Sequence, residues 1–266
     1  MNTTFKKLAG ILPSTVLVII CITSIIILQI PETKVQNSKL TVSEYQKLNN
    51  QEQLNLTFFQ KLPSLGFQNI LADWLYLKFI QYFGDSQARE KIGYTLSPDY
   101  FTQIVDRDPR FVDAMIKLDT ATSIFAGNPR KSVDLLAKSL DQIPSKLISV
   151  GTPSYYLWLY KGIDELLFLG NPKMAKKSYK MARNWAKTYP DQNSKNIVSR
   201  TEESINFLEK NPKSKVAQIG AWAVVLSNNP DPKTIKRAIQ EITSFGGKVT
   251  INPEGRLTVK VPPNIQ

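Results

Sequence analysis

Hydrophobic residues along most of the chain recur at the spacing of amphipathic α-helices, and short breaks of Gly, Asn and Pro separate the stretches. One stretch places Ile197, Thr201, Ile205 and Leu208 on a single helical face. Another, KVAQIGAWAVVL, is apolar nearly all round, which is typical of a buried helix. This pattern predicts an all-α domain over residues 61–245.

The pattern changes to that of β-strands near the end of the chain. In KVTINPEGRLTVKV, apolar and polar residues alternate on both sides of Asn-Pro-Glu-Gly, which predicts a short β-hairpin within residues 246–266. Gly255 would supply the positive φ of the turn. A two-stranded hairpin is only marginally stable alone, so we expect it to pack on a helix or on a partner.

A short motif in the helical region occurs twice, 43 residues apart, as FAGNPRKSVDLLAKS at residues 125–139 and FLGNPKMAKKSYKMA at residues 168–182. In each, the glycine suits the left-handed position that ends a helix. The asparagine suits an N-cap, and the proline suits the first turn of the next helix. Each motif therefore predicts a helix, a tight turn and a second helix. Asp108-Pro109 predicts the start of the preceding helix in the same way.

The second helix of each motif carries small and large residues at matching positions. These are Ser132, Leu136 and Ser139 in the first motif and Ala175, Tyr179 and Ala182 in the second. A small residue lets the paired helix approach closely, and the large residue four positions later fills the groove between the two helices.

This spacing resembles the second helix of the tetratricopeptide repeat (TPR) family, and Pro144 follows it as a proline does in that family. Trp158 and Gly162 resemble the Trp and Gly of the family's first helix. The period of 43 residues departs from the family's 34, and residues 145–153 resemble an insertion. The resemblance spans residues 66–245 and implies a TPR-like helical-hairpin solenoid. An unrelated helical bundle is the alternative.

Residues 11–30 form an uncharged apolar run, which is long enough to cross the ~30 Å hydrocarbon core of a bilayer as a helix. Two lysines precede it, so the positive-inside rule places residues 1–10 in the cytoplasm and the main domain in the periplasm or thylakoid lumen. No small-residue cleavage site follows the run, so we expect a single-pass signal anchor, with a cleaved signal peptide as the alternative. Residues 31–60 are polar and predict a stalk that is helical after Ser43.

The aromatic stretch FQNILADWLYLKFIQYF, residues 67–83, raises the question of a second membrane crossing. At about 1.5 Å per residue its length as a helix is about 25 Å, shorter than the bilayer core, and it contains Asp73 and Lys78. We therefore expect a buried first helix. An interfacial or partner-binding helix that uses Trp74 and Tyr76 is the alternative, and a spanning helix is the least favoured. The segment LADWLYLKFIQYFGD also resembles membrane-anchored TPR-like proteins, including cyanobacterial ones.

Composition limits the chemistry. The net charge of +12 favours an anionic partner, the chain has no histidine, and its single cysteine, Cys21, lies in the apolar run. The usual general base, the commonest zinc ligand and internal disulfides are therefore excluded. The neighbours Asp164-Glu165 and Glu202-Glu203 point about 100° apart on a helix, so we expect ion pairs with nearby lysines rather than acid–base catalysis. The chain is predicted not to be an enzyme, with no catalytic, cofactor-binding or metal-binding residue.

Two sets of residues are candidates for binding. Five lysines follow one face of a helix: Lys173, Lys176, Lys177, Lys180 and Lys187. They predict contact with an acidic protein patch or anionic lipid headgroups, and a solvated lysine face is the alternative. Tyr155 and Trp158, in YYLWLY, are candidates to line a peptide-binding groove of a solenoid, with packing between helices as the alternative.

Together these features predict a membrane-anchored protein–protein interaction scaffold that assists the assembly or maintenance of a membrane complex. The cyanobacterial resemblance implies a photosynthetic complex in a thylakoid or plasma membrane. The alternatives are a permanent accessory subunit of such a complex and a membrane-tethered enzyme of envelope glycans. Nucleic acid is not an expected partner on the predicted side of the membrane.

Overall fold

The computed structural model describes residues 18–20, 23, 40–146, 151–210, 215–227, 232–251 and 257–262. The chain forms two compact units, Met1–Lys47 and Leu48–Gln266. Most of the apolar run at residues 11–30 lies outside the described residues, so the membrane anchor stays a prediction. Among the residues that the structure describes, no helix combines the length and the apolar character needed to cross a membrane.

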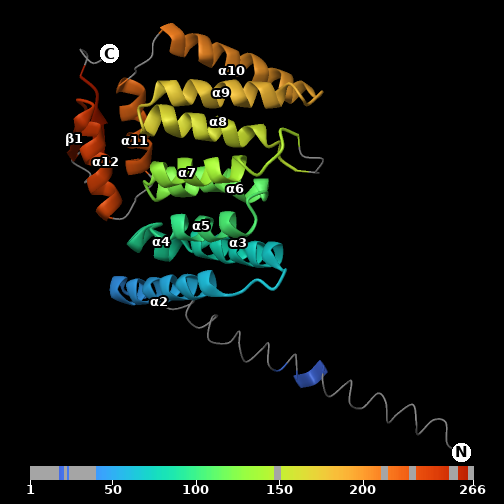
Figure 1. Cartoon of the computed structure of the whole chain (residues 1–266). Helices are drawn as coiled ribbons and strands as arrows, with labels where there is room; N and C mark the ends of the chain where they lie inside the picture. The colour runs from blue at the N-terminus through green and yellow to red at the C-terminus, as the bar shows by residue number, and fades with distance from the viewer. Residues whose placement is uncertain are drawn as a thin grey trace, which may run out of the picture. The chain divides into compact units, whose positions relative to one another are not determined.

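The second unit is predominantly α-helical and carries one small antiparallel sheet, which confirms the predicted helical class and the C-terminal hairpin (Figure 1). The α-helices of the described residues are α2 (Val42–Lys61), α3 (Gln68–Gly84), α4 (Ser86–Ile92), α5 (Ser97–Arg107), α6 (Val112–Asp119), α7 (Pro129–Leu140), α8 (Tyr155–Ile163), α9 (Pro172–Ala186), α10 (Gln192–Lys210), α11 (Lys215–Ser227) and α12 (Pro232–Ser244). The π-helical segments are η1 (Thr120–Phe125) and η2 (Asp164–Phe168), and the strands are β1 (Lys248–Ile251) and β2 (Leu257–Lys260).

Helices α3 to α10 are stacked in approximate chain order, with their axes roughly side by side (Figure 1). Close packing joins α3 with α5, α8 with α9, and α9 with α10. Helices α11 and α12 form a further pair that stands across one side of the stack, where α11 contacts η1 and η2. The second unit thus consists of a helical stack and a C-terminal cap, which comprises α11, α12, β1 and β2.

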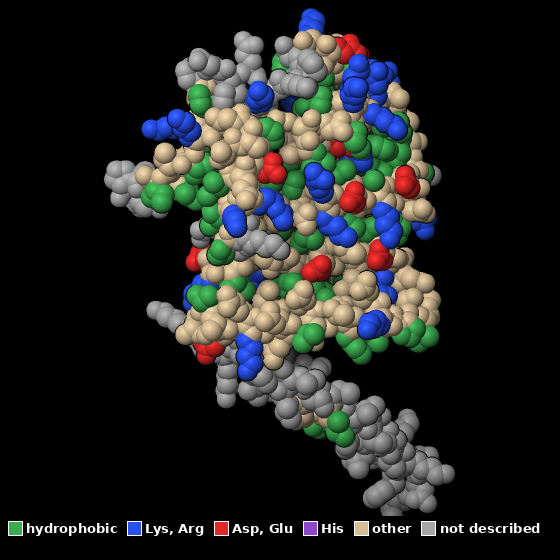
Figure 2. Space-filling view, turned by 60° about the vertical axis from the view of Figure 1, so that its left-hand side comes forward, with side chains coloured by type: hydrophobic (Ala, Val, Ile, Leu, Met, Phe, Trp, Pro, Cys, Tyr) green, Lys and Arg blue, Asp and Glu red, His purple; other side chains and the backbone are tan. Residues whose placement is uncertain are grey.

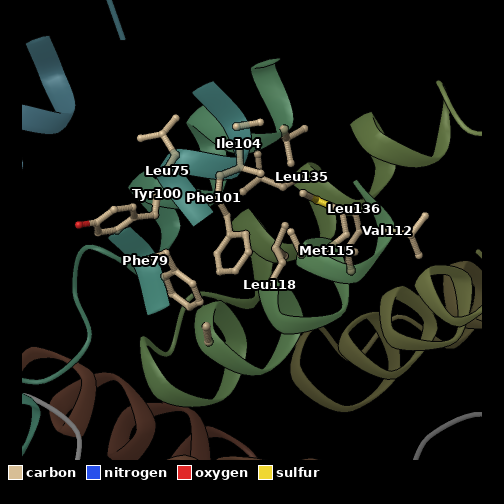
Figure 3. Close-up of a cluster of buried hydrophobic side chains, with 14 of the residues drawn as sticks. Leu75, Phe79, Tyr100, Phe101, Ile104, Val112, Met115, Leu118, Leu135 and Leu136 are labelled. Carbon is tan, nitrogen blue, oxygen red and sulfur yellow. The ribbon is translucent and has the colours of Figure 1, made fainter. Parts of the chain in front are cut away.

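The largest buried apolar cluster joins α3, α5, α6 and α7 (Figure 3). Phe79 and Phe101 contact each other there with 4.5 Å between ring centroids. Met115, Leu118 and Leu136 are fully buried in the same cluster. Burial of each such side chain stabilises the folded state by about 1.5–3 kcal/mol relative to exposure. The predicted aromatic helix is α3, and one of its faces belongs to this core.

Helix α2 extends the folded unit into the polar segment that the sequence assigned to a stalk. The segment is helical after Ser43, as predicted. From Leu48 onward it belongs to the second unit. There Leu56 is buried, and its carbonyl group accepts a hydrogen bond from Gln103 Nε2 at 2.7 Å. The greater part of α2 is therefore packed on the domain rather than free in solvent.

Both copies of the repeated motif build the same turn. Each first helix ends in a π-helical segment, and a glycine with positive φ follows, 58° at Gly127 and 60° at Gly170. The same two backbone hydrogen bonds close each turn: Ala126 N–H to Ala121 O (3.1 Å) and Asn128 N–H to Thr122 O (2.8 Å), then Leu169 N–H to Asp164 O (3.0 Å) and Asn171 N–H to Glu165 O (2.7 Å). The predicted glycine conformation is confirmed, whereas the π-helical geometry was not predicted.

The residues after each glycine start the second helix. Pro129 and Pro172 occupy the first positions of α7 and α9, as predicted. The asparagines differ. The Asn171 side chain accepts a hydrogen bond from Met174 N–H at 3.1 Å, whereas Asn128 makes no side-chain cap to the described start of α7. The predicted N-cap is therefore confirmed in the second motif alone.

The predicted helix start at Asp108-Pro109 is wrong. The Asp108 Oδ1 atom accepts a hydrogen bond from Arg110 N–H at 3.0 Å within a tight turn, and α6 begins only at Val112. The turn still contacts the repeated motif, because Ser139 Oγ donates a hydrogen bond to the carbonyl group of Pro109.

The small and large positions of the repeat pack as predicted. All of the small ones are fully buried: Ser132, Ser139, Ala175 and Ala182. A Cβ atom at Gly162 of α8 would lie 2.7 Å from Tyr179 Cε1 of α9, so the glycine makes room for the tyrosine ring. This close approach holds α8 against α9.

The C-terminal hairpin packs on helices, as expected for a sheet of two strands. Val249 pairs with Val259 across the strands. These two valines and Leu257 are partly buried, and they pack against the apolar cluster of α11 and α12 that contains Trp222. The turn that contains Gly255 lies outside the described residues.

The C-terminal cap closes directly over the two glycine turns. Its side chains donate hydrogen bonds to carbonyl groups of the turn regions: Thr234 Oγ1 to Ala126 O (3.3 Å), the Arg237 guanidinium to Gly127 O, and Gln218 Nε2 to Leu166 O (3.4 Å). A Cβ atom on either turn glycine would meet the cap, because it would lie 2.5 Å from Thr234 Cγ2 at the first turn and 2.5 Å from Gln218 Nε2 at the second. Glycine is therefore required both for the backbone conformation and for the fit of the cap.

We expect Gly127→Ala to lower the free energy of unfolding by about 2–4 kcal/mol, because it adds left-handed strain and a clash with Thr234. The matched control is Gly84→Ala, since nothing lies within 4 Å of a Cβ atom there. The control should change the free energy by less than about 1 kcal/mol. Urea unfolding followed by circular dichroism measures both, and equal values for the two variants would contradict the assigned role of Gly127.

Candidate functional site

Helix α9 presents lysines on one side and buries the other. The exposed lysines are Lys173, Lys177 and Lys180 of α9 and Lys187 directly after its end, here termed the lysine row. Small residues such as Ala175 and Ala182 are buried on the opposite face. Lys and Arg side chains gather toward the upper right of Figure 2, at the level of α9 and α10. The row therefore forms a positively charged strip on the surface of the helical stack.

The neighbouring cations of α9 have a different role. Lys176 is half-buried and forms an ion pair with Glu209 of α10 at 2.6 Å, and Arg183 pairs with Glu202 of α10. Within the described residues, none of the four lysines of the row takes part in an ion pair. Lys176 and Arg183 thus help to attach α10, whereas the row remains available to an outside anion.

A shallow groove of about 430 Å³ lies between α9, α10 and η2. Leu166, Tyr179 and Phe207 contribute apolar surface to it, and Arg200 and Glu203 contribute charged groups. Phe207 is 54% exposed, so an aromatic ring is accessible from solvent on the same helix pair that carries the lysine row.

The aromatic candidates of α3 belong mainly to the packing of the stack. Trp74 is half-buried, and its ring lies 4.4 Å from that of Phe59 on α2. Tyr76 contacts Phe111 edge-on at 5.2 Å between centroids. Each ring keeps only part of its surface exposed to solvent.

The aromatic candidates of α8 differ in exposure. Tyr155 is 1% exposed, and its hydroxyl lies 3.1 Å from Ser194 Oγ on α10. Burial is the main cause that raises the pKa of Tyr155 to about 12. Trp158 is half-buried and contacts Trp185 of α9 edge-on at 5.8 Å. The structure thus places Tyr155 inside the stack and leaves part of Trp158 accessible.

A buried pair of carboxyl groups lies where the two motif repeats meet. Asp119 ends α6 and Asp164 begins η2, and both side chains are buried close enough for the charge of Asp119 to raise the pKa of Asp164. Ser123 Oγ donates a hydrogen bond to Asp164 Oδ2 at 2.6 Å. Burial raises the pKa of Asp119 to about 6. Burial, and then the charge of Asp119, raises the pKa of Asp164 well above its usual range. The folded state therefore favours the protonated form of both carboxyl groups.

The neighbouring carboxylate points elsewhere. Glu165 is fully buried, pairs with Lys161 one turn earlier and accepts a hydrogen bond from Ser178 Oγ at 2.6 Å. The expected divergence of Asp164 and Glu165 is confirmed, and so is the ion pair with a nearby lysine in the case of Glu165. Replacement of either Lys161 or Glu165 by a neutral residue would leave the other charge buried and unpaired, which would strongly destabilise the folded state.

The convergence of Asp164 with Asp119 was missed at the level of sequence. The adjacent residues 164 and 165 do diverge, but the partner of Asp164 comes from the preceding helix. The sequence feature that could have indicated this pairing is the two acidic residues in the middle of the apolar stretch YYLWLYKGIDELLFLG, because buried acids require polar partners. Asp164 has no exposed surface, so a solute cannot reach it in this conformation.

Within the described part of the chain, no three His, Cys, Asp or Glu side chains come together as a metal site. Comparisons of the chain with known protein families, with curated proteins and with solved structures find no match. The TPR-like resemblance therefore depends on the residues and geometry described above.

The buried carboxyl pair should make stability depend on pH. The pKa of Asp119 is about 6 in the folded chain and near 3.8 ordinarily, so the folded state binds the proton more tightly. Tighter proton binding by Asp119 therefore raises the free energy of unfolding by on the order of 2–3 kcal/mol below about pH 4. This stabilisation is lost as pH rises through about 6. Unfolding midpoints measured from pH 4 to 7 test this.

The comparison that isolates the pair is Asp119→Asn against Asp134→Asn. Asp134 is an exposed residue of α7, so its replacement should leave the pH profile of the parent unchanged. Asp119→Asn should remove the part of the loss that belongs to Asp119, on the order of 2–3 kcal/mol, while Asp164 keeps its own part. Parallel profiles for the parent and Asp119→Asn would show that Asp119 does not bind its proton more tightly in the folded state.

Proposed function

We propose that the protein is a single-pass, membrane-anchored protein–protein interaction scaffold, with its N-terminus in the cytoplasm and a TPR-like helical-hairpin solenoid in the periplasm or thylakoid lumen. The observation that carries this proposal is the repeated helical hairpin. Its two copies share a π-helical end, a left-handed glycine and a proline-initiated second helix. Stacked hairpins of this kind form extended surfaces whose usual task is to bind other proteins.

The lysine row supports an acidic segment of a protein as the partner. Its four lysines lie at i, i+4, i+7 and i+14, three of them on α9 and the last directly after its end, so they offer one continuous strip of charge. The groove between α9, α10 and η2 adds apolar contact through Phe207. Charge of one sign steers an oppositely charged partner, and the apolar groove slows its release. Anionic lipid headgroups are the alternative ligand for the row.

The biological role that suits such a scaffold is assistance in the assembly or maintenance of a membrane complex, and the cyanobacterial resemblance points to a photosynthetic one. A permanent accessory subunit is the second candidate. It would accompany the mature complex in fixed proportion after mild detergent extraction, whereas an assembly factor would accompany incomplete complexes.

Neutralisation of the row tests the proposed binding surface. We expect replacement of Lys173, Lys177, Lys180 and Lys187 by Gln to reduce partner recovery about tenfold in affinity purification of the intact anchored protein. The control replaces four exposed lysines elsewhere with the same change in net charge: Lys195, Lys236, Lys248 and Lys260. Equal losses in both variants would mean that net charge, not the row, attracts the partner.

A further inference from the structure

Exposed apolar side chains gather where α2 turns into α3. They are Leu54 and Phe58 on α2, Leu65 and Phe67 in the connecting loop, and Ile70 in the first turn of α3, each more than 60% exposed. These five residues are termed the apolar corner. The α2–α3 connection lies at the opposite end of the stack from α9 and α10 (Figure 1). An exposed apolar set of this size on one short segment marks a contact surface.

The packing of α2 explains why two of these residues face outward. Leu56 is buried, and the Phe59 ring contacts Trp74 of α3. At 100° per residue, Leu54 and Phe58 project from the side of the helix opposite Leu56. One helix cannot bury both sides against the same neighbours, so Leu54 and Phe58 require another environment.

The loop adds a residue that packing does not explain. Leu65 is 82% exposed, and among the described residues it is the one non-glycine residue with positive φ, at 48°. The conformation is strained for a leucine, yet the side chain gains no burial from it within the domain. Backbone strain that presents an apolar side chain to the outside is typical of a functional contact.

The exposed apolar surface continues along α3. Leu77 and Ile80 are 62% and 45% exposed, and the helical period places them on the same face as Ile70. The opposite face of α3, with Leu75 and Phe79, lies in the core. The unusual apolarity of α3 therefore has two origins, a buried face and an uncovered one.

We propose that the apolar corner inserts into the interfacial layer of the membrane that holds the anchor, an inference that rests on the single-pass topology proposed above. Residues 31–41 join the apolar run to α2 and span at most about 40 Å when extended. The tether confines the corner to the neighbourhood of the bilayer, which gives the lipid surface a high effective concentration compared with any soluble partner. Exposed Lys61, between Phe58 and Leu65, suits lipid phosphates at the rim of the contact.

Fluorescence quenching in the full-length protein tests the insertion. The only native cysteine, Cys21, lies in the apolar run and serves as the reporter of the anchor. In a Cys21→Ala background, Leu65→Cys, Phe67→Cys and Lys187→Cys carry the same environment-sensitive fluorophore. Each protein is reconstituted in vesicles of phosphatidylcholine and phosphatidylglycerol, and brominated lipid is the quencher.

We expect quenching at positions 65 and 67 to be at least about threefold that at position 187, because interfacial insertion reaches ~5–10 Å into the headgroup boundary. The label at Cys21 should also be quenched. Quenching at Cys21 without quenching at 65 and 67 would overturn the inference and leave the anchor intact. A blue shift at 65 that grows with protein density but is not quenched would overturn it in favour of contact between copies of the chain. No quenching at Cys21 would refute the anchor itself.

Discussion

At both repeated turns of the stack the chain reverses direction through the left-handed region of the backbone, and a glycine provides that conformation. The π-helical segment before each glycine widens the end of the first helix, so its last carbonyl groups are reached by amides five and six residues later. The same glycines leave the space that Thr234 and Gln218 of the C-terminal cap occupy. The turns therefore fix the direction of each second helix and also form the surface on which the cap packs.

The same junction explains the acids in the core. Asp164 begins η2, and its carbonyl group takes part in closing the second turn while its side chain meets Asp119 and Ser123 of the first hairpin. The buried polar contacts thus connect one repeat to the next at the point where both change direction. A polar junction of this kind fixes the register of neighbouring hairpins more strictly than apolar packing does, because an unpaired buried carboxyl group is costly.

Features set by local sequence could be predicted, and features set by distant contacts could not. Helical periodicity located α9 and its exposed lysines, and the glycines and prolines located the turns, since both depend on neighbouring residues. The pairing of Asp164 with the first hairpin joins residues 41 positions apart, and the cap contact of Thr234 spans 108 positions. The aromatic residues of α8 show the same limit: periodicity identified a helix but not that its two neighbours would bury Tyr155 completely.

The positions of the two proposed surfaces within the second unit restrict what each can bind. The α2–α3 connection and α9 lie at opposite ends of the stack, separated by the intervening helical layers (Figure 1). At 8–10 Å per helical layer, this separation is on the order of 30–40 Å. With the apolar corner in the membrane, the lysine row is held several Debye lengths from that bilayer, where the attraction of anionic lipid is screened. The row is then directed toward a protein that stands out from the membrane surface, so membrane contact at one end favours an acidic protein partner at the other.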